Sequence, residues 1–259
     1  MNDLVVVERH GATSIVTLNE PARMNPFSEA MRHAALAALE AEMADRSVRA
    51  VVLTGAGGQF SAGADVRQMR ESAPDPAHAK RRLELLQSVV RLVAAGPKPV
   101  VAAVEGVAFG AGLSLAAACD YVVAGQGARF GAAFGRIGLT ADCGLLWSLP
   151  QRIGLARARD LLFTGRPVLA EEAVQIGLAD HLVPAGGALA AALAKAEQYL
   201  ATAPLSIAAM KAGLAEAPGG LEAALRLETH LQPMLALTAD HAEGRQAFLD
   251  KRPPNFTGG

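Results

Sequence analysis

The sequence predicts an α/β fold, and three observations indicate it. Short β-branched runs alternate with longer helical patterns in the N-terminal half, and no strand pattern follows about residue 185. The chain has 259 residues, of which 51% are hydrophobic and only 4% are aromatic. A chain of this length can bury one large core, which Ala, Val and Leu have to fill in place of large rings. Alternation of strands with helices is typical of α/β proteins.

The N-terminal half contains the predicted strands and the first two long helices. A first helix is expected after Ser28, whose hydroxyl can cap it, because apolar residues follow at three- and four-residue steps. A second helix is expected over residues 76–95, ended by Gly96 and Pro97. Five short β-branched runs are predicted to be strands, at residues 4–7, 14–18, 50–54, 100–104 and 121–123.

The last part of the chain is predicted to be helical. After about residue 185 it is rich in Ala, Leu and Glu, and breaks that contain Pro or Gly divide it into three or four helices. We therefore expect a core over residues 1–195 and a C-terminal helical region over residues 196–259 that belongs to the same domain. Such a region is too thin to enclose a core, so it has to pack on the α/β part or on another subunit. This favours a homo-oligomer.

Charge and cysteine content exclude several classes of function. Lys and Arg number 24 and Asp and Glu 25, a net charge of −1, so no basic excess is available for a nucleic acid partner. Two cysteines, Cys119 and Cys143, are too few for a disulfide framework, which favours a reducing cytoplasm, and no targeting segment is evident. Glu105 and three glycines interrupt the apolar run at residues 100–119, so no membrane span is expected. The six histidines show no ligand spacing, and we expect no metal site.

Four glycine-rich segments approach known phosphate-binding or nucleophile motifs but depart from them. Residues 55–60 and 110–115 lack the third glycine of a dinucleotide fingerprint. Residues 58–65 have Ala-Asp where a P-loop has Lys-Ser/Thr. Residues 112–116 end in Ala where a hydrolase nucleophile elbow has Gly, and they begin too far from the preceding strand. These departures exclude a P-loop NTPase and disfavour a dinucleotide-dependent enzyme and an α/β-hydrolase.

Two loops of very small residues, 60–65 and 107–112, each lie between a predicted strand and a predicted helix. Small residues let the backbone approach a ligand closely, and free N–H groups at the start of a helix suit an oxyanion. The same residues would equally allow tight packing of a helix on a strand. Spacing alone does not decide between these two interpretations.

These loops and several other segments resemble the crotonase superfamily, also called the enoyl-CoA hydratase/isomerase family, over nearly the whole chain. The resemblance implies a spiral of ββα turns with a C-terminal helical trimerisation region, a homotrimer or homohexamer, and an acyl-CoA substrate processed through an enolate. Coenzyme A is then part of the substrate, and no separate cofactor is expected. The segments that carry the resemblance are residues 18–25, 60–65, 104–106, 110–112, 118–120, 128–131, 165, 170–173, 177–179, 243–244, 247–248 and 251–253.

The resemblance also implies the groups that bind the substrate. The backbone N–H groups of Ala64 and Ala111 match the pair that binds the thioester oxygen, and each donor in such a site contributes about 3 kcal/mol to catalysis. Arg23 and the Ala62 carbonyl match positions that meet the phosphates and adenine of CoA. Other positions implied to bind substrate are Asp65, Val66, Gly110, Ser114 and Phe134.

Two of these positions depart from the hydratases, whose water addition uses two glutamates. The matching residues are Ser114 and Phe134, which cannot act as acid and base near neutral pH. One carboxylate remains in this region, Asp142. Its placement resembles that of an aspartate in the phenylacetate-pathway isomerase of ring-modified CoA thioesters, where it moves a proton. It also resembles the aspartate with which the chlorobenzoyl-CoA dehalogenase attacks the ring.

We therefore predict a cytoplasmic acyl-CoA double-bond isomerase in which Asp142 is the proton shuttle. Three alternatives stay open: a hydratase that positions water without the two glutamates, a ring dehalogenase, and a non-catalytic acyl-CoA-binding relative. Asp142 could also cap a helix that begins near Cys143. An apolar wall that raises the pKa of Asp142 is expected from its neighbours Leu139, Leu145, Leu146 and Phe134.

Overall fold

The computed structural model describes residues 3–65, 75–216 and 219–259, and its strands form two sheets. The strands are β1 (Val5–His10), β2 (Thr13–Leu18), β3 (Ala50–Gly55), β4 (Val100–Val104), β5 (Val107–Phe109), β6 (Tyr121–Gly125), β7 (Arg129–Gly131), β8 (Pro167–Leu169) and β9 (His181–Val183). The larger sheet begins with an antiparallel hairpin and continues with parallel strands, in the order β1-β2-β3-β4-β6-β9. The smaller sheet has the order β5-β7-β8.

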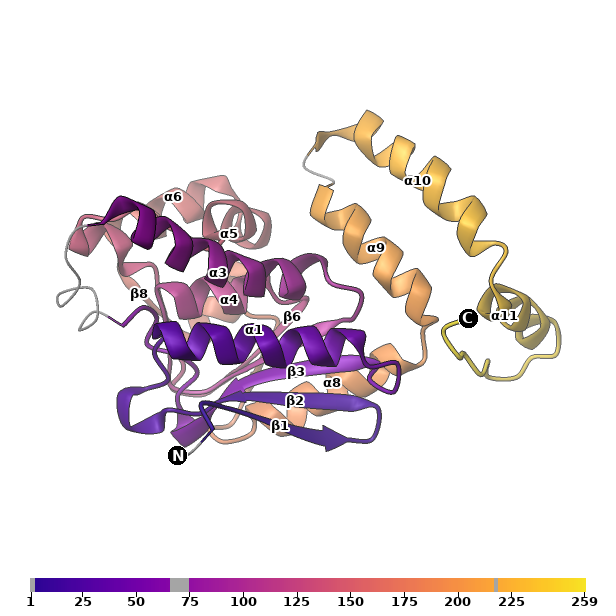
Figure 1. Cartoon of the computed structure of the whole chain (residues 1–259), viewed down its shortest axis with the longest axis horizontal. Helices are drawn as coiled ribbons and strands as arrows, with labels where there is room; N and C mark the ends of the chain where they lie inside the picture. Colours follow the sequence, from indigo (N-terminus) through magenta and orange to yellow (C-terminus); the bar gives the residue numbers. More distant parts are fainter. Residues whose placement is uncertain (1–2, 66–74, 217–218) are drawn as a thin grey trace.

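Helices cover the larger sheet on both faces, with α1 on one face and α8 on the other (Figure 1). The helices are α1 (Glu29–Ala44), α3 (Pro76–Ala95), α4 (Ala111–Ala118), α5 (Leu145–Ile153), α6 (Leu155–Thr164), α7 (Ala170–Ile176), α8 (Ala188–Leu200), α9 (Pro204–Glu216), α10 (Leu221–Leu235) and α11 (Ala239–Leu249). Short 3-10 turns are η1 (Pro21–Arg23), η2 (Ala56–Gly58) and η3 (Ala133–Ile137). Among the described ranges, no helix is long and apolar enough to cross a membrane.

The alternating side chains of β3 explain why both faces are covered. Val51 and Leu53 belong to a core shared with α1 and α3. Ala50 and Val52 point to the opposite face, because successive side chains of a strand alternate, and they pack against α8. The face of α8 that meets the sheet is made of small, fully buried residues, which let the helix lie close to the strands: Ala188, Ala192 and Ala196.

The elements predicted from the sequence are confirmed, with small shifts at their ends. The Ser28 Oγ accepts a hydrogen bond from the N–H of Met31 at 3.2 Å, so it caps α1 as predicted. Helix α3 covers the predicted residues and ends before Gly96. Each predicted strand overlaps an observed strand. The strands that the sequence did not predict are three residues long, too short to show an alternating pattern: β5, β7, β8 and β9.

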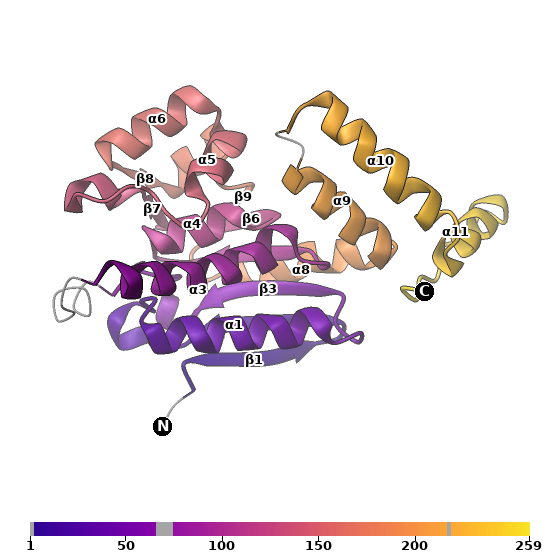
Figure 2. The same cartoon turned by 45° about the horizontal axis from the view of Figure 1, so that its top comes forward.

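Helices α9, α10 and α11 extend away from the sheet (Figures 1 and 2). The expected division at residue 195 falls within α8, which packs on the larger sheet, so the helices that stand apart begin with α9. Lys211 joins α9 to the core. Its Nζ lies 2.5 Å from Asp120 Oδ2 and donates hydrogen bonds to the carbonyl oxygens of Val93 and Lys98, both at 2.9 Å.

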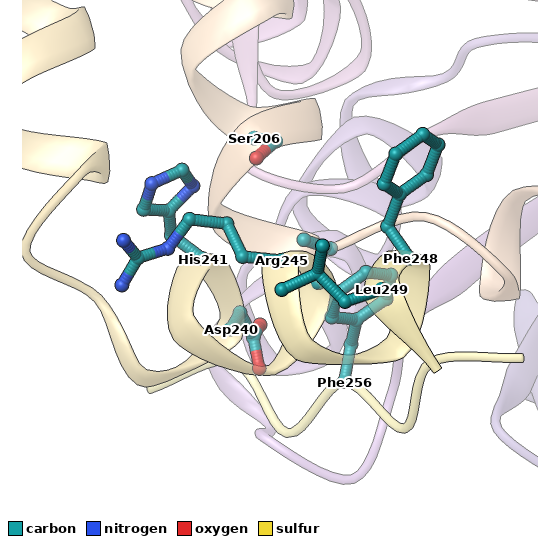
Figure 3. A pocket seen from close by; sticks show the side chains of 9 residues that line it. Ser206, Asp240, His241, Arg245, Phe248, Leu249 and Phe256 are labelled. Atoms are coloured by element: carbon teal, nitrogen blue, oxygen red, sulfur yellow. The ribbon is translucent and has the colours of Figure 1, made fainter. Parts of the chain in front are cut away.

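The same three helices expose many large apolar side chains. Leu237 is 88% exposed and Phe248 is 83% exposed. A cavity of about 510 Å³ lies between the start of α9 and α11, and Phe248 and Leu249 form part of its lining (Figure 3). Leu237 lies in the turn between α10 and α11. Exposed large apolar side chains in such number are typical of protein–protein contacts. The exposed residues are Leu205, Met210, Leu214, Leu221, Leu225, Met234, Leu237, Phe248 and Leu249.

Candidate active site

The two small-residue loops lie side by side, because their backbones pair directly. The N–H of Phe60 donates to the Glu105 carbonyl and the N–H of Ser61 to the Val107 carbonyl, both at 2.8 Å. The N–H of Phe109 returns a bond to the Ser61 carbonyl at 3.0 Å. Because of this short parallel pairing, the ends of both loops lie next to each other at the start of α4.

The two backbone donors predicted at Ala64 and Ala111 belong to this place. Ala111 is the first residue of α4, where an N–H has no acceptor within the helix. Within the described residues, neither the Ala64 N–H nor the Ala111 N–H donates a backbone hydrogen bond. Gly63, directly before Ala64, comes so close to the second loop that a Cβ on it would lie 3.3 Å from the Ala111 nitrogen. The loops therefore bring together two free donors that suit one oxyanion.

Glycine is required where the two loops meet. Gly63 has φ of +91°, and a Cβ there would lie 2.4 Å from the Phe109 carbonyl oxygen. Gly110 has φ of +51° directly before Ala111. Both conformations are strained for residues with a side chain. The glycines therefore allow the two loops to approach each other closely.

Arg23 is fixed to the first loop by an ion pair. Its Nη2 lies 2.5 Å from Asp65 Oδ2 and its Nη1 lies 3.0 Å from Glu20 Oε1. The carboxylate of Asp65, itself buried, accepts this hydrogen bond and raises the pKa of Arg23. The Ala62 N–H donates to the Met24 carbonyl at 2.8 Å, so the Arg23 turn and the first loop move as one unit. Val66, the next predicted position, lies outside the described residues.

Asp142 does not cap a helix, so the alternative role that the sequence left open for it is excluded. Helix α5 begins at Leu145, and the position before it is Gly144, with no side-chain capping bond. Cys143 and Gly144 have φ of +52° and +77°, so the chain turns through two left-handed residues between Asp142 and the helix. The Asp142 carbonyl accepts from the Leu145 N–H at 3.0 Å and from the Ser114 Oγ at 3.1 Å. The side chain is thereby left free of a capping role.

The Asp142 carboxyl is partly buried, and its Oδ1 has no hydrogen-bond partner in the described part of the chain. Burial raises its pKa, against the opposing effects of the Cys143 thiol and the Arg32 charge. The predicted rise in pKa is confirmed. Of the four residues predicted to form an apolar wall, Leu145 and Phe134 are buried, whereas Leu139 and Leu146 are 48% and 59% exposed in the single chain and do not fit that prediction.

Ser114 and Phe134 are the residues predicted to stand where the hydratases have two glutamates. The Ser114 Oγ, fully buried, bonds the Gly110 carbonyl at 3.2 Å and the Asp142 carbonyl at 3.1 Å, so it joins the second loop to the turn that carries Asp142. The Phe134 ring lies against Gly110, where a Cβ would be 3.9 Å from its Cζ. At the described positions that the sequence assigned to the site, Ser114 therefore supplies a bridging hydroxyl, Phe134 supplies a ring, and Asp142 supplies a carboxyl.

Two structural roles were not found from the sequence. Glu105 Oε1 accepts hydrogen bonds from the N–H groups of Gly186 and Ala188 at 3.0 and 3.1 Å, so this carboxylate caps α8. Arg32 is 5% exposed on the interior side of α1. In the sequence, the signal for this burial is that Arg32 directly follows Met31 of the apolar stripe of the helix.

Neither the two cysteines nor the possible metal ligands offer a second kind of chemistry. Burial raises the pKa of Cys143 far above its usual value and that of Cys119 to about 12, so both remain thiols. Within the described ranges, no three His, Cys, Asp or Glu side chains group as metal ligands do. The cavity of Figure 3 belongs to α9 and α11 and contains none of the loop residues.

The fold and site together define a class of protein: an α/β protein in which two paired loops leave two backbone N–H groups without a backbone acceptor among the described residues, and in which a nearby turn carries a partly buried carboxyl. The sequence profile described as "Enoyl-CoA hydratase/isomerase" matches residues 8–259. The chain therefore belongs to the enoyl-CoA hydratase/isomerase family, the crotonase superfamily, and the predicted crotonase-like fold is confirmed.

Individual relatives cover nearly the full chain. A Thermus thermophilus protein, provisionally named an enoyl-CoA hydratase, is 42% identical over 255 residues, which are 98% of this chain and 100% of the relative. The 1,2-epoxyphenylacetyl-CoA isomerase of Escherichia coli is 39% identical over 248 residues and covers 94% of each chain. The crystal structure of an enoyl-CoA hydratase from Polaromonas sp. JS666 superposes with a TM-score of 0.90 at 35% identity, over 97% of this chain and 99% of that one.

Proposed function

We propose that the protein isomerises a double bond in acyl-CoA thioesters and that Asp142 is its proton shuttle. The observation that carries the proposal is the partly buried Asp142 carboxyl with its raised pKa, on a turn whose backbone carbonyl accepts a hydrogen bond from Ser114 of α4. A carboxyl in such an environment changes between its base and acid forms more easily than an exposed one. The relatives are named as hydratases and as an isomerase, so the choice between these reactions rests on the residues of the site.

The proposed reaction moves one proton along the acyl chain. The Asp142 carboxylate takes a proton from the α-carbon of a β,γ-unsaturated thioester, and the electrons move onto the thioester oxygen. The N–H groups of Ala64 and Ala111 stabilise this dienolate. The protonated Asp142 then gives its proton to the γ-carbon, the double bond forms between the α- and β-carbons, and the carboxylate is restored. No second acid or base is needed.

Hydration makes demands that these residues do not meet. A water molecule has to be oriented and deprotonated while a proton is delivered to carbon, which requires a second proton-transfer group. Ser114 is occupied with two carbonyl oxygens and Phe134 has no polar atom. Hydration of crotonyl-CoA is therefore expected to be at least about 10²-fold slower than in an enzyme that has both carboxylates. A turnover number equal to that of a fast hydratase contradicts the proposal.

The direct test is Asp142→Asn, measured on a β,γ-unsaturated acyl-CoA. The variant keeps the size of the side chain but cannot take a proton, so kcat should fall by at least about 10²-fold while CoA-ester binding persists. Asp160→Asn on α6, an exposed carboxylate paired with Arg166, is the control and should retain the wild-type rate. Isomerisation by Asp142→Asn at the wild-type rate would exclude Asp142 as the shuttle.

We also propose that α9, α10 and α11 form the interface of a homotrimer or of a homohexamer built from trimers. The support is the apolar surface of these helices, where Leu237 and Phe248 are almost fully exposed in the single chain. Light scattering on the purified protein tests the assembly. Replacing both side chains by Asp should shift it to smaller species, whereas a monomeric wild type contradicts the proposed interface.

A further inference from the structure

Two arginines from different helices lie together in the interior near Asp142. Arg32 of α1 is 5% exposed, and its Nη1 donates a hydrogen bond to the Arg82 carbonyl of α3 at 2.9 Å. Burial and the nearby Arg82 charge lower the pKa of Arg32, while Cys143, Asp142 and Glu29 act in the opposite direction. Two like charges therefore share this interior region with the turn that carries the proposed proton shuttle.

The guanidinium groups hold donors that no acceptor satisfies. In the part of the chain that the structure describes, Arg32 Nε and both Nε and Nη2 of Arg82 are buried and make no hydrogen bond. The Asp142 Oδ1 is likewise buried and has no hydrogen-bond partner in this part of the chain. A buried charged donor without an acceptor is strongly unfavourable, because it has lost its water and gained nothing in return. Among the described residues, none supplies an acceptor to these nitrogens, so the region suits an acceptor from a bound ligand.

A structural role explains one contact of the pair and leaves the other donors unexplained. The bond from Arg32 to the Arg82 carbonyl ties α1 to α3, which needs a single donor. Arg152, a structural arginine in the same chain, shows what a satisfied guanidinium looks like. It donates to two carbonyl oxygens and pairs with Asp180 at 3.0 Å.

We propose that Arg32 and Arg82 form a subsite for a carboxylate carried by the acyl part of the substrate, so that the preferred thioesters are CoA monoesters of dicarboxylic acids. The inference rests on the proposed function as an acyl-CoA enzyme. Guanidinium forks match the two oxygens of a carboxylate, which can accept from both arginines at once. Arg23, fixed to the first loop through Asp65, is the arginine expected to meet the phosphates of CoA.

An unsubstituted acyl chain is the poorer occupant for a physical reason. Apolar carbons would offer the three unsatisfied nitrogens no acceptor, so the donors would stay unpaired. Glu29 is the other acid that acts on Arg32, but its carboxylate is half exposed and also lies 3.9 Å from His78 Nε2, so it does not fill the interior. A carboxylate at the end of the acyl chain supplies the missing acceptor and the opposite charge.

The test measures binding of saturated thioesters by calorimetry, so that no isomerisation can occur. Succinyl-, glutaryl- and adipyl-CoA are each compared with the neutral ester of the same length: butyryl-, pentanoyl- and hexanoyl-CoA. At one length or more, the dicarboxylic ester should bind at least 10-fold more tightly. Arg32→Gln and Arg82→Gln should each reduce this ratio to below 3-fold. Arg81→Gln, whose side chain is 66% exposed on α3, is the matched control and should leave the ratio as in the wild type.

Three outcomes overturn the subsite. The first is equal or tighter binding of the neutral ester at all three lengths. The second is a preference for the dicarboxylic ester that survives both glutamine variants. The third is a failure of all six thioesters to bind, which also overturns the proposed function, whereas binding of the neutral esters with no preference overturns the subsite alone. If Arg32→Gln does not fold, Arg82→Gln decides the second outcome.

Discussion

The loops around Asp142 and the helices α9–α11 leave opposite kinds of groups unsatisfied. Around Asp142 the backbone turns through left-handed φ at Gly63 and Cys143, and a carboxyl oxygen is buried without a partner. Helix α11, in contrast, has a satisfied N-terminus: the Thr238 Oγ1 accepts a hydrogen bond from the His241 N–H at 3.1 Å. What these helices leave exposed are apolar side chains such as Phe248. Unsatisfied polar groups mark a site for a small molecule, and uncovered apolar surface marks a site for another protein chain.

The largest effect should follow from disturbing the contact between the two loops. Gly63→Ala places a Cβ 2.4 Å from the Phe109 carbonyl oxygen, which has to move and shift the Ala111 donor with it. A misplacement near 1 Å at a reacting group costs about 10²-fold, so kcat/KM should fall by at least that factor. Steady-state kinetics with a β,γ-unsaturated thioester measures it.

The control for Gly63→Ala is Gly58→Ala. Gly58 also has a positive φ, +67°, but nothing lies within 4 Å of a Cβ there. This variant should lose about 1 kcal/mol of stability from backbone strain and keep its kcat/KM. Equal losses of activity in both variants would mean that backbone strain, and not the approach of the loops, determines the rate.

The next largest effect concerns the connection between the two regions. Lys211→Met removes the charge that pairs with Asp120 and leaves that carboxylate, whose side chain is 26% exposed and whose pKa is raised by burial, without its cation. Breaking such a pair should destabilise the protein by about 2–3 kcal/mol, or roughly 5–10 °C in a chain of this size. Thermal unfolding measures the shift.

A double variant separates the charge effect from the loss of packing. Adding Asp120→Asn to Lys211→Met removes the unpaired carboxylate, so part of the lost stability should return. If the two losses simply add, the pair is not coupled. The connection of α9 to the core would then depend on the carbonyl contacts of Lys211 at Val93 and Lys98.

Local sequence patterns predicted the regular elements of both regions but only part of the site. The Ser28 cap and the limits of α3 follow from residues within a few positions of each other, and both are confirmed. The small residues of the two loops likewise indicated a close approach. The sequence left a capping role open for Asp142. The structure excludes it because two consecutive left-handed residues, Cys143 and Gly144, separate Asp142 from the helix, and sequence does not show that a cysteine adopts such a conformation.

Contacts between distant segments account for what the sequence did not reveal. Arg32 and Arg82 are 50 positions apart, and their proximity depends on the packing of α1 against α3. Glu105 caps a helix that begins at Ala188, through bonds that no local motif indicates. Leu139 and Leu146 are close to Asp142 in sequence, yet both side chains are exposed in the single chain.

A smaller effect is expected from pH on the stability of the site region. The pKa of Asp142 is raised above 3.8 in the folded protein by burial, so the folded state binds its proton more tightly than the unfolded state does. Stability therefore falls as pH rises from 3.8 through the folded pKa, and the penalty persists at neutral pH. Asp142→Asn removes it, so the variant should melt a few °C higher than the wild type at pH 7, with the difference shrinking toward pH 4. A constant difference across this range contradicts the assignment to Asp142.

The smallest effect should come from Gly213 in α9. Gly63→Ala is expected to damage the protein, whereas an alanine at Gly213 is expected to improve its stability. Gly213 has ordinary helical geometry, and nothing lies within 4 Å of a Cβ built on it. Gly213→Ala should therefore stabilise the protein by about 0.5–1 kcal/mol through helix propensity. Ala212→Gly, at the exposed neighbouring position, should lose a similar amount. Thermal unfolding at several protein concentrations checks both, and a Gly213→Ala variant that is less stable and dissociates more readily would show that a partner chain already fills the space beside Gly213.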